Sequence, residues 1–172
     1  EAVTVDNQGT LSGTGIAIKA AELDNTTSTA QIFSSDKLDL TIQGDITNTD
    51  GALVHADTDL TLDAKGNLTN SGTVEAVGSS SLTTKNLTNS GTILAQDSSL
   101  SIETSKIDNQ GVLAGNGITI NADSLNNKTT NAKIFSSDKV DLTIDGEINN
   151  TDGALVHAGS DVNLDAKGNL TN

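Results

Sequence analysis

Apolar and polar residues alternate along most of the chain in short stretches. The pattern is clearest at Ile16–Ile18, Leu60–Leu62 and Ile118–Ile120, where a polar or small residue separates two aliphatic ones. Such alternation is typical of β-strands that bury one side only. No segment places apolar residues at the spacing of a helix face over several turns, so we expect no long helix. The pattern therefore predicts an all-β protein made of many short strands.

The chain repeats a long segment of itself, with 45 of 65 aligned positions identical. Residues 6–70 align with residues 108–172 without a gap, at an offset of 102 (108 against 6). The segment IFSSDK, for example, occurs at Ile32–Lys37 and again at Ile134–Lys139. A long internal repeat is typical of solenoids, whose units stack on one another. We therefore interpret residues 1–172 as a single β-helical fragment of a longer fibre, with two copies of a 102-residue super-repeat.

A shorter unit recurs inside this long repeat. It opens with an aliphatic residue, any residue and Asn, and successive Asn residues of this kind lie 18 to 23 positions apart. Most of these Asn residues are followed by a Gly-containing turn, a short apolar stretch, a polar gap and an alternating strand, as in Asn89–Ile102. A unit of this length with three short strands corresponds to one coil of a parallel β-helix. We therefore predict a parallel β-helix of about 8 coils, each of 18–23 residues.

The recurrent Asn has a predicted structural role. Side-chain amides stacked at one corner of successive coils can form a hydrogen-bonded ladder along the axis. An inward Asn also satisfies backbone groups at the turn. We favour this role over ligand binding. The predicted ladder consists of Asn7, Asn25, Asn48, Asn70, Asn89, Asn109, Asn127 and Asn150.

Composition adds further constraints. The net charge of -14 repels a phosphate backbone, so we predict no nucleic-acid partner. No apolar run approaches the ~20 residues of a membrane-spanning helix, so we predict no membrane span. The chain has no Cys, Pro, Met, Trp or Tyr and only two Phe, which leaves Leu, Ile, Val and Ala to fill a narrow core. Nucleotide-binding loops, zinc-ligand spacings and EF-hands are absent from the sequence, and we predict no cofactor and no metal site.

Several units resemble the repeats of filamentous haemagglutinin. They are Asn67–Val74, Asn86–Ala95 and Asp108–Gly115, and the resemblance extends over essentially the whole chain. These repeats belong to large exoproteins of Gram-negative two-partner secretion systems, among them adhesins and contact-dependent growth inhibition effectors. The resemblance implies a right-handed β-helical stem that passes unfolded through an outer-membrane transporter barrel and folds outside the cell. It also implies a secreted, extracellular protein attached to the outer surface of a Gram-negative bacterium.

The resemblance leads us to expect a structural stem segment that projects a distal adhesive or toxin-delivery region. Receptors on host cells or other bacteria would bind other regions of the protein. The alternative is an adhesive segment that binds host or neighbouring-cell glycans or proteins through Phe33, Phe135 and two extra stretches, Thr26–Gln31 and Lys128–Lys133, which we expect to bulge or form side loops. We predict that the chain is not an enzyme, because a single active site would interrupt the repeat and no Arg is present to bind a carboxylate or phosphate.

Two His and two Phe residues occupy equivalent places in the two copies. His55 and His157 could bind a metal, but they lie five coils apart, roughly 24 Å at ~4.8 Å per coil. The sequence pattern aligns them with the Ala, Gly or Ser of other units, as packed or corner residues. Phe33 and Phe135 each follow an Ile that we expect to point inward, so alternation places both rings outward. The two Phe lie five coils apart, and we interpret each as a residue that packs locally.

Acidic residues and glycosylation sequons are numerous, and we attribute neither to a specific site. Stacked acids could bind Ca²⁺, but the calcium-binding nonapeptide is absent, and we expect a solvated face at Asp36, Asp39, Asp57, Asp59 and Asp63. Asn and Thr dominate the repeat, so chance explains the Asn-x-Ser/Thr sequons. These sequons begin at Asn25, Asn67, Asn86, Asn127, Asn149 and Asn169.

Overall fold

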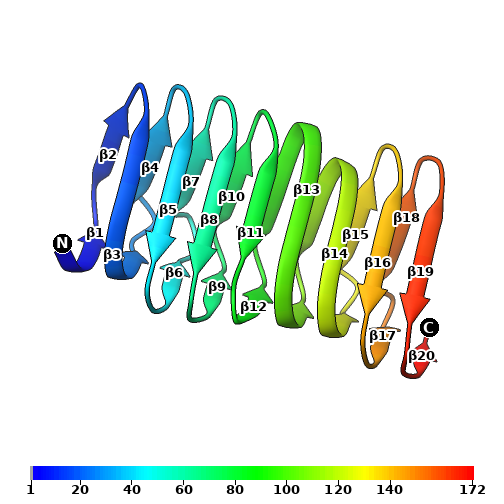
Figure 1. Cartoon of the computed structure of the whole chain (residues 1–172). Helices are drawn as coiled ribbons and strands as arrows, with labels where there is room; N and C mark the ends of the chain where they lie inside the picture. The colour runs from blue at the N-terminus through cyan, green and yellow to red at the C-terminus, as the bar shows by residue number, and fades with distance from the viewer. Residues whose placement is uncertain (1) are drawn as a thin grey trace.

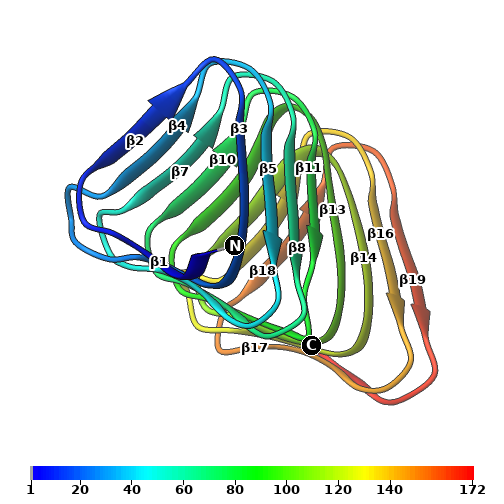
Figure 2. The ribbon, with the colours of Figure 1, turned by 60° about the vertical axis from the view of Figure 1, so that its left-hand side comes forward.

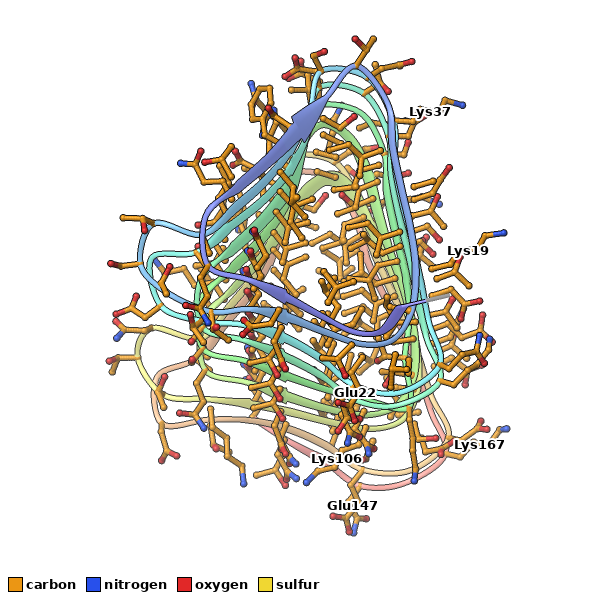
Figure 3. All side chains as sticks on the ribbon, turned by 90° about the vertical axis from the view of Figure 1, so that its left-hand side faces the viewer. Lys19, Glu22, Lys37, Lys106, Glu147 and Lys167 are labelled. Atoms are coloured by element: carbon orange, nitrogen blue, oxygen red, sulfur yellow. The ribbon has the colours of Figure 1, made fainter. Side chains whose placement is uncertain are left out.

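The computed structural model describes residues 2–172 and is a solenoid of β-strands. The chain winds around one axis, and each coil adds a layer to three parallel sheet faces (Figure 1, Figure 2). Seen from the N-terminal end in Figure 3, the chain turns clockwise as it recedes, which makes the solenoid right-handed. This is the hand that the twist of parallel strands favours. The predicted all-β parallel β-helix is confirmed.

Each coil contributes to three faces, which we name the Phe face, the middle face and the Asn face. The short strands of the Phe face are β2 (Thr10–Gly13), β4 (Gln31–Ser34), β7 (Leu53–Ala56), β10 (Thr73–Ala76), β15 (Lys133–Ser136) and β18 (Leu155–Ala158). Those of the middle face are β5 (Leu38–Ile42), β8 (Leu60–Ala64), β11 (Ser80–Thr83), β16 (Val140–Ile144) and β19 (Val162–Ala166). Those of the Asn face are β1 (Ala2–Asn7), β6 (Ile46–Asn48), β9 (Leu68–Asn70), β12 (Asn86–Asn89), β17 (Ile148–Thr151) and β20 (Leu170–Thr171).

Three longer strands continue from one face to the next. β3 (Ile16–Asn25) belongs to the middle and Asn faces, whereas β13 (Thr92–Asn109) and β14 (Val112–Lys128) run through all three. β13 and β14 pair in parallel round both corners, with one register shift between Ala95 and Ser99. Apart from that shift, the corners of β13 and β14 have the same number of residues. Backbone hydrogen bonds between these two coils therefore continue through the corners, whereas in other coils the strands end there.

The inside of the solenoid is filled by columns of aliphatic side chains. On the Phe face, Val54 lies between Ile32 of the preceding coil and Val74 of the following coil, and all three are buried. Figure 3 shows apolar side chains inside the coils, while charged residues such as Lys19 and Lys37 point outward. Burial of each Leu, Ile or Val side chain contributes about 1.5–3 kcal/mol. Stacked aliphatic residues therefore form the core without aromatic rings.

The turn after several ladder Asn residues is tight, and Gly91 illustrates why Gly recurs there. A Cβ atom at Gly91 would collide with the carbonyl oxygen of Gly72 in the preceding coil, and one at Gly111 would collide with that of Gly91. The coils thus approach each other through backbone atoms at this corner. At Gly91 and Gly111 the glycine is therefore required by space, whereas Gly51, with a φ of 80°, also adopts a backbone conformation that favours glycine.

The two extra stretches form turns between the Asn face and the Phe face. In the first, the backbone N–H of Ala30 donates to the carbonyl of Thr27 at 3.1 Å, and Ala132 repeats the bond to Thr129 at 3.1 Å. Thr27 has a φ of 145° and Thr129 a φ of 96°, which is unfavourable for a β-branched residue. The loops lie at the side of the solenoid in Figure 2, and the last residue of each extra stretch already belongs to the following strand.

Candidate functional site

The Asn face carries a continuous row of side-chain amides on its inner side. Each amide donates a hydrogen bond from Nδ2 to Oδ1 of the Asn in the next coil, over 2.7–2.8 Å. We call this row the Asn ladder. Its members are Asn7, Asn25, Asn48, Asn70, Asn89, Asn109, Asn127, Asn150 and Asn172.

The amides of the ladder also bond to the backbone. Asn70 Nδ2 donates to the carbonyl of Thr92 at 3.1 Å, and Asn89 Nδ2 donates to that of Val112 at 3.2 Å. Asn89 is fully buried, with an exposed fraction of 0 %. Throughout residues 2–172, every buried side-chain nitrogen or oxygen has a hydrogen-bond partner. The geometry of the ladder is suited to holding neighbouring coils in register.

The outer side of the Phe face carries the two aromatic residues. The ring of Phe33 stacks on the imidazole of His55 in the next coil, with centroids 4.7 Å apart and 7° between the planes. Phe135 and His157 repeat the contact at 4.9 Å and 17°. Alternation does place Phe33 outward, because its neighbour Ile32 is fully buried. Each Phe thus packs locally, against a His of the adjacent coil that the sequence pattern did not place beside it.

The position of the His residues corrects their alignment with small residues. Strand register pairs His55 with Phe33 on one side and with Glu75 on the other. The small residue of the same strand is Ala56, one position later and fully buried. A shift of one residue moves a side chain from the inside of a sheet to the outside. His55 is therefore an outward residue in the middle of β7 and not a corner residue.

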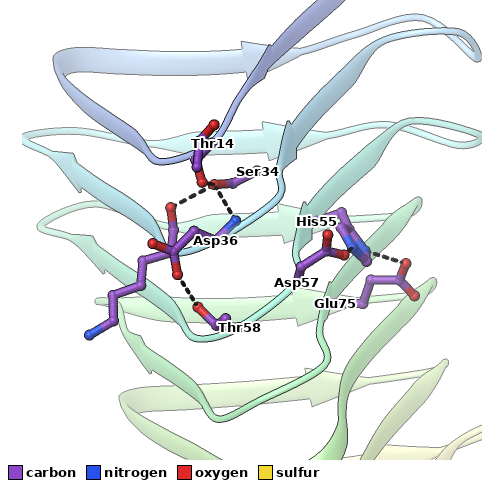
Figure 4. A network of polar contacts seen from close by, with 8 residues as sticks. Thr14, Ser34, Asp36, His55, Asp57, Thr58 and Glu75 are labelled. Carbon is purple, nitrogen blue, oxygen red and sulfur yellow. Dashed lines mark hydrogen bonds and ion pairs between the residues drawn. The ribbon is translucent and has the colours of Figure 1, made fainter.

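Two carboxylates complete a group around His55, which we call the His55 cluster: Phe33, His55, Asp57 and Glu75. The imidazole Nδ1 lies 2.8 Å from Glu75 Oε1, and Nε2 lies 2.7 Å from Asp57 Oδ1 (Figure 4). The His55 side chain is only 13 % exposed. Burial lowers the pKa of His55, but hydrogen bonds and charge from Asp57 and Glu75 outweigh burial, so the pKa lies above its ordinary value of 6.5.

The second copy of the repeat keeps the stacked pair and changes its surroundings. Gly159 occupies the place of Asp57, so the residue two positions after His157 has no carboxylate. The Phe135 ring is 43 % exposed, whereas Phe33 is half-buried. The two equivalent sites thus differ in acidity and in the exposure of the aromatic ring.

The other acidic residues lie on the outside of the solenoid, and several pair with Lys. Lys65 Nζ lies 2.8 Å from Asp63 Oδ1, and Lys106 Nζ lies 2.8 Å from Asp108 Oδ2. Burial raises the pKa of Asp108, but hydrogen bonds from Lys106 and Asn126 bring it below the ordinary value. In the described part of the chain, no group of three or more His, Asp or Glu residues is arranged to hold a metal ion. The carboxylates of the His55 cluster bind opposite sides of the ring and do not converge on one point.

The structure separates the sequons into two kinds. Asn25 and Asn127 are ladder residues with an exposed fraction of 0 %, so their amides are inaccessible in the folded solenoid. Asn67 and Asn86 are half-buried and linked by a hydrogen bond of 2.8 Å from Asn86 Nδ2 to Asn67 Oδ1. Asn169 is exposed. Only the sequons outside the ladder offer an accessible amide.

The repeated coils of this chain match a known protein family. The model of the haemagglutinin repeat family matches residues 1–72, 37–132 and 113–172, which together span the chain. The chain belongs to the haemagglutinin repeat family. The resemblance of the repeat units to those of filamentous haemagglutinin is thereby confirmed. The searches of curated proteins and of solved structures find no match.

Membership in the haemagglutinin repeat family gives a coarse functional class. Haemagglutinin repeats form adhesin-like segments of secreted exoproteins in a two-partner secretion context, and their solenoid is structural rather than typically enzymatic. Among residues 2–172, no helix is long and apolar enough to cross a membrane. Two groups of polar side chains in this haemagglutinin repeat segment connect neighbouring coils: the buried Asn ladder and the outward His55 cluster.

Proposed function

We propose that the chain is a stem segment of a secreted exoprotein on the outer surface of a Gram-negative bacterium. The stem projects a distal adhesive or toxin-delivery region away from the cell. The observation that supports this most strongly is the Asn ladder, which runs from Asn7 to Asn172 and links every coil to the next. A surface for a receptor needs one well-formed patch, whereas a stem needs this kind of continuity.

Rigidity follows from how each coil is held. Parallel backbone pairing joins neighbouring coils on all three faces, and the ladder adds one buried side-chain bond per coil. Bending the solenoid would stretch these bonds on one face and compress the aliphatic columns on another. Eight coils at ~4.8 Å give a rod of about 40 Å. Repetition of the same unit lengthens the rod without any new type of contact.

Export through an outer-membrane transporter barrel fits the same composition. The chain contains no Cys, so no disulfide obstructs an extended chain in a narrow pore. The net charge of -14 opposes aggregation of the unfolded, strand-forming chain before the coils assemble. Folding outside the cell then requires only local pairing of each coil with the preceding one.

An adhesive segment is the second candidate function. The observation that favours it is the outward, 43 % exposed ring of Phe135 on the Phe face. Phe33, by contrast, is half-buried and stacked on His55. An adhesive role would use Phe135 and the neighbouring turn at residues 129–132 to bind glycans or proteins of host or neighbouring cells.

Deletion of one 102-residue unit from the full-length exoprotein distinguishes the two functions. Removing residues 7–108 joins Asp6 to Asn109, its equivalent neighbour, and keeps every coil in phase. A stem should retain the distal activity on this shorter rod. The control is Phe135→Ser in the undeleted protein, which leaves the stem intact. The adhesive role would be established instead if Phe135→Ser abolished cell binding and if cell binding by the deletion variant fell in proportion to the copies removed.

A further inference from the structure

The His55 cluster connects three successive coils by side chains alone. Phe33 comes from β4. His55 comes from β7 and Glu75 from β10, and Asp57 follows β7 at the corner; Figure 4 shows these three side chains together. No other outward position of the described chain shows a ring stacked on one neighbouring coil and hydrogen-bonded to the other. The cluster therefore joins coils from the outside, where the Asn ladder joins them from the inside.

The protonation state of the ring decides whether both hydrogen bonds can exist. An ionised carboxylate only accepts hydrogen bonds, whereas a neutral imidazole has one donor nitrogen and one acceptor nitrogen. Both ring nitrogens of His55 face carboxylate oxygens, at 2.8 Å and 2.7 Å. Two donors at these positions require the imidazolium form. A neutral ring would place a nitrogen lone pair against one of the two carboxylates.

The stack on Phe33 favours the same charged form. The rings lie almost parallel at 4.7 Å, and the face of an aromatic ring attracts a cation. The charged groups around the imidazole are Glu75 on β10 and Asp57 on its own chain segment, while β4 contributes the uncharged Phe33. Among the described residues, Asp57 and Glu75 are the charged groups that act on the His55 pKa, and both favour the charged ring.

We propose that His55 is a proton-operated clamp on the stem, closed on β4 and β10 when the ring is charged and released from β10 or from Asp57 when the ring is neutral. The clamp is a regulatory device that is independent of whether the segment is a stem or an adhesive surface. In the second copy Gly159 stands in the place of Asp57, so the contact between the imidazole Nε2 and Asp57 has no counterpart at His157.

The sign of the pH effect follows from linkage. Burial lowers the pKa of His55, but Asp57 and Glu75 raise it further, so the folded-state pKa exceeds the ordinary 6.5. A group of this kind stabilises the folded coils fully below its unfolded pKa, and the stabilisation disappears as pH rises through the folded pKa. The clamp therefore closes in mildly acidic solution and opens as the solution becomes alkaline.

An NMR titration of the two His side chains in the 172-residue chain tests the clamp. The variant Asp57→Asn/Glu75→Gln removes both carboxylates, and the matched control Asp39→Asn/Glu103→Gln removes the same charge from the outer side of the middle face. We expect the His55 midpoint to fall in the first variant and to stay near the wild-type value in the control. An unchanged midpoint in the first variant, or an equal fall in both, would overturn the proposal.

Amide hydrogen exchange measures whether protonation of His55 changes how often the neighbouring coils open. The Asp57 N–H donates to the carbonyl of Ser34 at 2.9 Å, and the Gly159 N–H makes the equivalent bond to Ser136 at 3.0 Å. The measured exchange rates are first corrected for the intrinsic increase of amide exchange with pH. If folding raises the pKa of His55 by one unit, the opening equilibrium at the Asp57 amide should then increase about tenfold from acidic to alkaline solution. Opening at Gly159 should change less. Equal pH dependence at the two amides in the wild type would contradict the clamp.

Discussion

The two copies of the 102-residue repeat differ almost entirely on the outside of the solenoid. Twenty of the 65 aligned positions carry different residues in residues 6–70 and 108–172. In the first copy only two of these positions are buried, and both exchange one aliphatic residue for another: Leu38 for Val140 and Leu60 for Val162. The remaining differences change polar or outward residues. The inside of the coil is thus fixed by packing, while the outside accepts local chemistry.

The His55 cluster is an instance of that outside variation. Both copies stack a Phe on a His, at 4.7 Å and 4.9 Å between centroids, but only the first adds Asp57 beside the ring. The stacked pair belongs to the repeat, whereas the pair of carboxylates belongs to one place along the rod. A single substitution on the outside can therefore give one coil a property that its equivalent lacks.

The largest effect should come from placing a charge on the inside. Ile93 has an exposed fraction of 0 %, and Ile93→Asp should lower the free energy of unfolding by more than about 3 kcal/mol because the carboxylate is buried without a partner. Its neighbour Thr92 points outward, and Thr92→Asp should cost less than about 1 kcal/mol. Urea unfolding of both variants gives the comparison. A larger loss for Thr92→Asp would mean that the two faces of β13 are assigned in reverse, and equal losses would contradict a strand that buries one side only.

Loss of one ladder amide should have an intermediate effect. Asn89→Ala removes the acceptor of Asn70 Nδ2 and the donor to Asn109 Oδ1. Unfilled buried polar groups cost about 1–3 kcal/mol, and we expect a decrease of about 2 kcal/mol in the free energy of unfolding. The control is Asn86→Ala in the same strand, which removes an outer amide and should cost about 0.5 kcal/mol. Urea unfolding measures both variants. Equal unfolding midpoints for Asn89→Ala and Asn86→Ala would mean that the ladder adds nothing to the stability of the fold.

The smallest expected effect distinguishes the two stacked pairs. His55→Gln should destabilise the chain below about pH 6, where the charged ring bonds to both carboxylates, and should cost less at alkaline pH. This direction follows because the pKa of His55 is raised in the folded state. The same change at His157, beside Gly159, should cost less in acid. Unfolding by urea at both pH values tests this, and identical losses at the two His residues would remove the distinction between the copies.

The sequence predicts the inside of this protein better than its outside. Spacing of the ladder Asn and the aliphatic columns follows from a fixed inner geometry, so the coils and the face that Ile93 occupies can be read from the pattern. The His55 cluster could not be found in this way because the turn before the Phe face varies in length. The inward aliphatic residue follows the ladder Asn by seven positions at Ile32, six at Val54 and four at Val74.

Those unequal turns hide the register between neighbouring coils. If Leu53 is taken as the first aliphatic residue of the strand, His55 aligns with small residues such as Ala76. If the buried Val54 is taken instead, His55 aligns with Phe33 and Glu75. A usable signal was therefore present in the sequence, in the recurring pattern of aliphatic residue, outward residue and small residue. The carboxylate contacts of His55 depend on side-chain directions that no spacing specifies.

The length of the rod tests the central claim most directly. Duplication of residues 7–108 in the full-length exoprotein adds five coils in phase, and electron microscopy of the exported protein measures the result. The stem account predicts a rod longer by about 24 Å, at about 4.8 Å per coil, with unchanged width. A duplicated unit that thickened the particle, or left its length unchanged, would contradict a continuous solenoid.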